Sequence, residues 1–219
     1  MIDSNTFVVF DLDDTLYEES EYQSSGLFAV AKIINRAYGN DLKQKILEWK
    51  TAGVRDIFSE VCRELGLPAS AKEGFIWTYR LHKPTIKLSI NARETVNLIE
   101  NGSAGIAILT DGRSISQRLK LSALGLLEYP LYISEEWGSE KPELDRFEEI
   151  QRRHPARTYV YVGDNPSKDF KAPNQLGWET IGLRGNDKNI HLQTVDGLPS
   201  AYHPKLWISK LEELRDYLC

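Results

Sequence analysis

Short runs of apolar and β-branched residues alternate along this chain with segments in which apolar positions recur every three or four residues. Runs of the first kind predict strands, and segments of the second kind predict helices. The predicted strands are 6–11, 105–111, 131–134, 158–164 and 179–183, with a shorter run at 206–208. Strands that alternate with helices are typical of βαβ units around a parallel sheet.

The same pattern predicts helices near 91–101, 114–124, 142–153 and 169–177. Three of them run into a glycine, the residue that most often ends a helix in the left-handed conformation. These glycines are Gly102, Gly125 and Gly177. The predicted fold class is therefore α/β, with a three-layer Rossmann-like core and a central parallel sheet.

The connection between the first two predicted strands is too long for a simple alternation of strands and helices. Residues 12–104 separate the first two predicted strands, whereas a single crossover helix needs far fewer residues. The stretch has helical spacing throughout, and its helices stop at Pro68 and Pro84. We therefore predict a core made of residues 1–17 and 84–219 and an inserted α-helical domain at 18–83. An insertion at this place follows the carboxyl end of a strand, where open α/β sheets bind ligands.

Composition and charge narrow the possible partners. The chain has 219 residues, of which 41% are hydrophobic and 27% charged, as in ordinary globular proteins. A net charge of −5 argues against a nucleic-acid binder and against a polybasic membrane patch. No apolar run reaches the length of a membrane span, and the first residues do not resemble a secretory signal. We expect a cytoplasmic monomer or homodimer with no nucleic-acid or membrane partner.

Histidine and cysteine give no sign of a metal site. The two cysteines, Cys62 and Cys219, are too few and too far apart for a disulfide framework or a zinc knuckle. Cys62 falls on the apolar face of its helix, which predicts a core position. The four histidines are scattered without the spacing of metal ligands, and we expect them at the surface.

Acidic residues follow three of the predicted strands. The segments concerned are 11–15 (Asp-Leu-Asp-Asp-Thr), 110–112 (Thr-Asp-Gly) and 163–169 (Gly-Asp-Asn-Pro-Ser-Lys-Asp). If the strands are parallel, these carboxylates converge at one edge of the sheet, where they repel one another unless a cation is present. Oxygen ligands favour a hard divalent ion, most simply Mg²⁺.

Each of these segments alone has an ordinary explanation, because an aspartate after a strand is most often a turn or capping residue. Their occurrence in order, each directly behind a predicted strand, is much rarer by chance. An EF-hand calcium loop starting at Asp11 would need glycine at its sixth position and glutamate at its twelfth. Those positions hold Leu16 and Tyr22, so this alternative fails.

Together with Lys141 in the Ser-Glu-Lys-Pro segment, these motifs resemble in order the four motifs of the haloacid dehalogenase-like (HAD) hydrolase superfamily. The resemblance covers about 6–16 and 88–200. The helical insertion stands where this superfamily carries its C1 cap, although residues 18–83 contain no motif that we can assign. Tyr17, Glu18 and Glu19 follow the first motif directly, and we expect them near the entrance to the cap.

The resemblance implies a role for each motif residue. Asp11 would be the nucleophile that forms an aspartyl-phosphate, and Asp13 would act as general acid and base. Thr110 would bind a phosphoryl oxygen, and Lys141 would screen negative charge around the nucleophile. The implied substrate-binding residues are Thr110, Asp111, Gly112 and Lys141. The implied Mg²⁺ ligands are Asp11, Asp13 through its backbone carbonyl, Asp164 and Asp169.

The resemblance favours a Mg²⁺-dependent phosphatase that acts on a small phosphoester, with a sugar phosphate as the first guess. A phosphoglucomutase-like phosphotransferase would use the same Asp11 and Asp13 and stays open. A 2-haloacid dehalogenase is disfavoured, because that branch neither uses the second aspartate nor needs a metal. A non-catalytic HAD-like binding protein is a further alternative, against which the intact motif positions count.

Overall fold

The computed structural model describes residues 2–186 and 188–219. The chain folds into two compact units, one formed by Met1–Ser20 with Lys87–Cys219 and the other by Glu21–Ile86. Among the described residues, no helix is both long and apolar enough to cross a membrane.

The first unit is built on a six-stranded sheet with the strand order β3-β2-β1-β4-β5-β6, in which every neighbouring pair is parallel. The strands are β1 (Thr6–Phe10), β2 (Gly105–Thr110), β3 (Leu131–Ile133), β4 (Thr158–Gly163), β5 (Glu179–Leu183) and β6 (Leu206–Ile208). The chain adds strands to one side of β1 and then to the other, so the order reverses at β1 and β4. Ligands bind at such a reversal, beyond the carboxyl ends of the strands.

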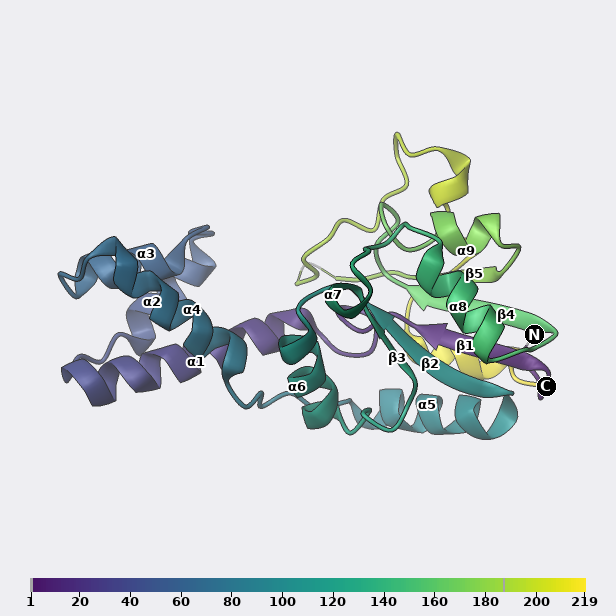
Figure 1. The fold of residues 1–219 in the computed structure, drawn as a ribbon, viewed down its shortest axis with the longest axis horizontal. Helices are drawn as coiled ribbons and strands as arrows, with labels where there is room; N and C mark the ends of the chain where they lie inside the picture. Colours follow the sequence, from purple (N-terminus) through teal and green to yellow (C-terminus); the bar gives the residue numbers. More distant parts are fainter. Residues whose placement is uncertain (1, 187) are drawn as a thin grey trace. The chain divides into compact units, whose positions relative to one another are not determined.

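Helices cover both faces of this sheet, as the fold class predicts. They are α5 (Ile90–Gly102), α6 (Ser114–Leu124), α7 (Ser134–Trp137), α8 (Asp145–Arg153) and α9 (Lys171–Gln175). In Figure 1, α5 lies along one face, and α8 and α9 lie along the other. Phe7 and Val9 of β1 pack with Phe147 and Ile150 of α8 in one buried cluster. The predicted α/β fold with a central parallel sheet is therefore confirmed.

The bounds of some helices differ from the prediction, because a turn stands where regular structure was expected. The helix predicted from residue 142 begins only at Asp145. The segment after β3 forms α7, which is too short for a periodic pattern to reveal. Gly125 and Gly177 adopt the left-handed conformation expected after a helix, with φ of 71° and 76°. Gly102 does not, because it is the last residue of α5 and Ser103 follows it in an extended conformation.

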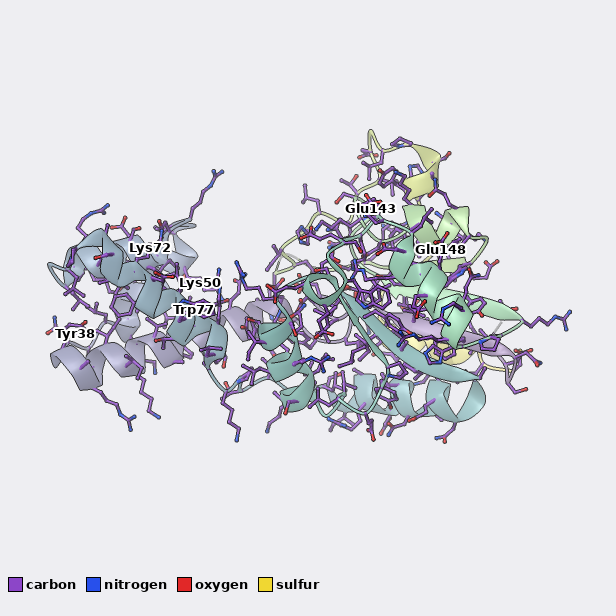
Figure 2. All side chains as sticks on the ribbon, viewed as in Figure 1. Tyr38, Lys50, Lys72, Trp77, Glu143 and Glu148 are labelled. Atoms are coloured by element: carbon purple, nitrogen blue, oxygen red, sulfur yellow. The ribbon has the colours of Figure 1, made fainter. Side chains whose placement is uncertain are left out.

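The second unit is helical. It contains most of α1 (Glu19–Tyr38), followed by α2 (Lys43–Thr51), α3 (Ile57–Glu64) and α4 (Lys72–Leu81). The buried residues of its core are Leu27, Val30, Ala31, Ile34, Leu42, Ile46, Val61, Cys62 and Phe75. Tyr38 at the end of α1 and Trp77 on α4 stay 46% and 43% exposed and lie outside this core (Figure 2).

Cys62 takes the core position predicted for it. His82 does not take the expected surface position, since it is only 8% exposed. Its Nδ1 lies 2.6 Å from the carbonyl oxygen of Tyr79 and its Nε2 lies 3.0 Å from Ser25 Oγ. A carbonyl only accepts, so Nδ1 donates and Nε2 accepts the serine proton. This pairing satisfies a neutral imidazole, and burial lowers the pKa of His82.

Candidate active site

A pocket of about 300 Å³ lies at the carboxyl ends of β1, β2 and β4. The parallel register brings these ends together, because Phe10 of β1 pairs with Ile108 on one side and Val162 on the other. The residues that line the pocket are mostly charged. They are Asp11, Asp13, Asp14, Glu19, Thr110, Asp111, Gly112, Glu140, Lys141, Asp164, Asn165, Lys168 and His191.

Three buried carboxylates meet at one end of the site. Oxygen atoms of Asp11, Asp164 and Asp169 all lie within 4.8 Å of one another. Asp169 is fixed from behind, because the backbone N–H of Asn165 donates to its Oδ2 at 2.7 Å and the Tyr161 hydroxyl donates to its Oδ1 at 3.1 Å. A side chain on Gly163 would come within 2.5 Å of Asp169 Oδ2, so the turn after β4 needs glycine there.

Lys141 supplies positive charge to this cluster. Its Nζ lies 2.5 Å from Asp11 Oδ1 and 2.6 Å from Asp169 Oδ1. Burial lowers the pKa of Lys141, but the charges of Asp11 and Asp169 raise it well above its ordinary value. The lysine therefore stays charged at neutral pH.

One lysine does not balance three carboxylates. Burial raises the pKa of Asp11 to about 7 despite the opposing charge of Lys141. Burial, together with the charges of Asp169 and Asp11, raises the pKa of Asp164 to about 9. These shifts show that burial beside a third carboxylate and a single lysine disfavours the charged forms of Asp11 and Asp164 in the protein alone. The all-oxygen donor set and this surplus of negative charge fit a hard divalent cation such as Mg²⁺.

Asp13 lies outside the three-carboxylate cluster. Lys120 Nζ on α6 lies 2.8 and 2.9 Å from its two carboxylate oxygens. Gln117 Nε2, also on α6, donates to Asp13 Oδ2 at 2.9 Å, and the Tyr17 hydroxyl donates to Oδ1. The two aspartates of the first motif thus have different surroundings, one beside the other carboxylates and one against a helix.

The last residue of β2 and the two that follow it are held in place by side chains from three helices. Gln117 Nε2 donates to Thr110 Oγ1 at 2.7 Å. The Asp111 carboxylate accepts from Arg146 Nη2 at 2.6 Å and from the backbone N–H of Lys141 at 3.2 Å. The Gly112 N–H donates to Ser134 Oγ at 2.9 Å. The Asp111 carboxylate is therefore engaged by the protein itself, although Thr110, Asp111 and Gly112 all line the pocket.

Sequence reasoning missed Gln117, Lys120 and Arg146. Gln117 and Lys120 share the buried face of α6 with Leu121 and Leu124. Arg146 is completely buried on α8. The available signal was a polar side chain at a position where helical periodicity predicts an apolar one, because a buried polar group needs a partner.

The loop after β5 contacts both the first motif, at Asp14, and the carboxylate of Asp164. Asp14, whose φ is 56°, accepts hydrogen bonds from the backbone N–H groups of Glu19 and Ile190 at 2.8 and 2.9 Å. Gln193 Nε2 of the same loop donates to Asp164 Oδ2 at 3.1 Å. Burial and the charge of Asp13 raise the pKa of Glu19 to about 7. Glu19 lines the pocket, whereas Glu18 pairs with Lys188 at 3.2 Å on the surface.

The fold and this arrangement of strand-end carboxylates define a hydrolase of the HAD-like type. The sequence matches the family described as haloacid dehalogenase-like hydrolase over residues 8–183. This match spans most of the chain, and the chain belongs to that family.

Relatives in the family share much of the chain. A glyceraldehyde 3-phosphate phosphatase from Methanocaldococcus jannaschii is 29% identical, over 84% of this chain and 87% of its own length. A ribulose-1,5-bisphosphate 5-phosphatase from Halopiger xanaduensis is 27% identical, over 96% of this chain and 98% of its own. The magnesium-bound HAD-hydrolase YfnB from Bacillus subtilis has the same fold, with a TM-score of 0.66, 22% identity, and coverage of 98% and 99% of the two chains.

Proposed function

We propose that this HAD-like hydrolase is a Mg²⁺-dependent phosphatase that removes phosphate from a small phosphorylated sugar through an aspartyl-phosphate intermediate. The observation that carries the proposal is the unlike environment of Asp11 and Asp13. Asp11 lies with Asp164, Asp169 and Lys141, whereas Asp13 is turned toward Gln117 and Lys120. Two carboxylates with different surroundings are suited to two different roles.

In the first step, a carboxylate oxygen of Asp11 attacks the phosphorus atom, and the bond from phosphorus to the ester oxygen breaks. Asp13 gives its proton to the departing alkoxide. In the second step, Asp13 takes a proton from a water molecule that attacks the same phosphorus atom. Inorganic phosphate leaves, and the Asp11 carboxylate is restored.

The remaining residues hold charge in place during both steps. The Thr110 hydroxyl would donate to a phosphoryl oxygen. Lys141 bridges Asp11 and Asp169 and lowers the repulsion between the nucleophile and an anionic substrate. Asp11, Asp164 and Asp169, with the backbone carbonyl of Asp13, would hold Mg²⁺, which when bound supplies positive charge to the phosphoryl oxygens.

The substrate class is proposed from the relatives and from the size of the pocket. The two curated relatives described above are named for phosphatase activity on phosphorylated sugars. A pocket of about 300 Å³ lined by charged residues suits a small polar molecule. Residues 18–83 would act as the cap that selects among such substrates.

The test of this proposal is a phosphate-release screen over sugar phosphates, nucleotides and 4-nitrophenyl phosphate. We expect turnover of at least one sugar phosphate, loss of turnover in EDTA and recovery with excess Mg²⁺. Asp11→Asn is the matched control and should reduce every activity to background. Full activity in chelator would contradict the metal assignment. Phosphate retained on an organic product would show a phosphotransferase, and halide release from 2-haloacids without phosphate release would show a dehalogenase.

A second experiment separates the two aspartates. Asp13→Asn keeps the nucleophile but removes the acid and base, so aspartyl-phosphate formation from a sugar phosphate should slow by roughly 10²–10⁴-fold. The 4-nitrophenolate group leaves without a proton, so that substrate should give a burst of nitrophenol followed by slow turnover. An equal loss of the first step with both substrates would contradict the acid–base role of Asp13.

The proposed cap is tested by exchange. Replacing residues 18–83 with the cap of another family member should change the order of preference among sugar phosphates and preserve Asp11-dependent turnover of 4-nitrophenyl phosphate. An unchanged order of preference would show that loops of the core select the substrate.

A further inference from the structure

Two polar side chains occupy the buried face of α6, where apolar residues would pack. Gln117 is 2% exposed and Lys120 is 4% exposed, and they share this face with Leu121 and Leu124. Replacing a buried ion pair with apolar residues of similar volume is often neutral or stabilising. Stability alone therefore does not explain a lysine and a glutamine at these positions.

The contacts of Gln117 fix its orientation. Its Nε2 lies 2.9 Å from Asp13 Oδ2, 2.7 Å from Thr110 Oγ1 and 2.8 Å from the carbonyl oxygen of Asp111. A carboxylate and a carbonyl only accept, so the amide NH₂ must face this group. Among the described residues, Oε1 of Gln117 is buried without a hydrogen-bond partner. The side chain thus leaves its own acceptor unsatisfied in order to donate to the first two motifs.

This orientation also directs the Thr110 hydroxyl. Gln117 Nε2 shares its two protons among three acceptors and cannot itself accept, so the single hydroxyl proton of Thr110 must point elsewhere. Thr110 lines the pocket, so its proton is available to a phosphoryl oxygen there. Gly112 leaves the room that Gln117 needs, since a Cβ at that position would lie 3.2 Å from the amide of Gln117.

Lys120 acts on the other motif residue. Its Nζ contacts both oxygens of Asp13, at 2.8 and 2.9 Å, and lies 3.9 Å from the carboxylate of Glu19. This two-oxygen contact holds the carboxylate at a set distance and direction from the ammonium group. The Tyr17 hydroxyl approaches Oδ1 as well.

We propose that Gln117 and Lys120 are positioning residues of the active site: Lys120 holds the Asp13 carboxylate in the orientation for proton transfer, and Gln117 ties that carboxylate to the Thr110 hydroxyl. The inference rests on the proposed phosphatase function and deepens it. Lys120 contacts the Asp13 carboxylate directly, whereas Gln117 contacts both Asp13 and Thr110. The two residues should therefore fail in different ways.

The test compares Lys120→Met and Gln117→Met, which keep side-chain length, with Arg118→Met on the same helix. Arg118 is the matched control, because its half-exposed side chain pairs with Glu136 at 2.7 Å and is outside the pocket lining. Rapid-mixing kinetics would measure aspartyl-phosphate formation from the best sugar phosphate and from 4-nitrophenyl phosphate. Thermal midpoints of all variants show whether each one folds.

Lys120→Met should slow the first step with the sugar phosphate by roughly 10–100-fold, part of the full contribution of a general acid, and by less than about 3-fold with 4-nitrophenyl phosphate. KM should stay near the wild-type value. Adding Lys120→Met to Asp13→Asn should cause no further loss in this step, since both changes act on one group. Lys120→Arg, which keeps donors for both carboxylate oxygens, should retain more of the rate than Lys120→Met.

Gln117→Met should instead slow the first step and raise KM with both substrates, because Thr110 would bind the phosphoryl group common to both. Three results for Lys120→Met would overturn the inference while the wild type remained a phosphatase. They are an equal loss with both substrates, a further loss on the Asp13→Asn background, and kinetics like those of Arg118→Met. A wild type without phosphate release would overturn the proposed function, and this inference with it.

Discussion

Arg146 offers a direct measure of how much the protein depends on a buried charge behind the pocket. Its side chain is completely buried on α8. The guanidinium donates to the backbone carbonyl oxygens of Thr110 and Tyr132 at 3.1 and 3.3 Å, and to Asp111 Oδ1 at 2.6 Å. It therefore joins the ends of β2 and β3 to the turn that carries Lys141, whose N–H donates to the same Asp111 carboxylate.

The Arg146→Met variant keeps the length of the side chain and removes the charge. Two carbonyls lose a donor, and the Asp111 carboxylate, 15% exposed, loses its guanidinium partner. Removing one partner of a buried pair costs about 3–5 kcal/mol. We expect the lower end, about 3 kcal/mol, because Asp111 keeps the Lys141 N–H and Lys168 Nζ at 3.4 Å. For a chain of this length, that corresponds to a fall in Tm of roughly 6–12 °C.

The free energy of unfolding would be measured by urea denaturation at pH 7.5. Arg152→Met is the control, because Arg152 lies on the same helix in an exposed pair with Glu149, and its loss should change stability by less than about 0.5 kcal/mol. The double variant Arg146→Met with Asp111→Asn should be more stable than Arg146→Met alone, since the unpaired charge is gone. A loss below about 1 kcal/mol for Arg146→Met, or no recovery in the double variant, would refute this reasoning.

Two other predictions concern single residues. Burial lowers the pKa of His82 below its unfolded value, so the unfolded chain binds the proton more readily. The free energy of unfolding should therefore be highest above about pH 6.5 and fall as the pH drops below that value. The fall due to His82 should be at most about 1.4 kcal/mol per pH unit. Urea midpoints from pH 7.5 to 5.5 should show a smaller fall for His82→Asn than for the wild type and for the exposed control His191→Gln, and parallel curves would contradict the assignment. Gly112→Ala should reduce both stability and phosphate release, because φ at this position is 140° and the new Cβ would press on Gln117. Gly177→Ala, with φ of 76° and open space around the Cβ, should reduce stability only, and a similar loss of activity in both variants would show that backbone strain, not Gln117, is responsible.

The sheet was predictable because its signal is local and repeated. The runs that form β1, β2 and β4 are buried along nearly their whole length, so they read as continuous apolar segments that end at the sheet edge. Asp11, Thr110 and Asp164 each stand at the end of one of these runs. They could therefore be predicted to lie together, since parallel strands bring their carboxyl ends to one edge of the sheet. Short elements such as α7 and the turn before α8 lack such a signal, because fewer than two helical turns show no period.

The environment of each motif residue was not predictable in the same way. The sequence places Asp11 and Asp13 two positions apart and cannot show that one meets Asp164 while the other meets Lys120, which is more than a hundred positions away. Likewise, the place of Asp111 in the second motif implies substrate binding, yet its carboxylate pairs with Arg146 and accepts a hydrogen bond from a backbone N–H. Such pairings depend on which helix faces cover the sheet, and this is decided by packing over the whole unit.

A physical criterion connects the residues that sequence reasoning missed. Gln117, Lys120 and Arg146 all occupy the buried stripe of a helix that follows or precedes a motif, and each donates to a motif residue or its backbone. Their desolvation is unfavourable, so a sequence selected for stability alone would place leucine or methionine there. A polar side chain on the apolar face of a helix next to a strand-end aspartate is therefore itself a signal for a residue that orients the site. In this chain α6 and α8 both carry that signal, because buried polar residues interrupt their apolar stripes. The position of each stripe can be found from helical spacing in the sequence alone.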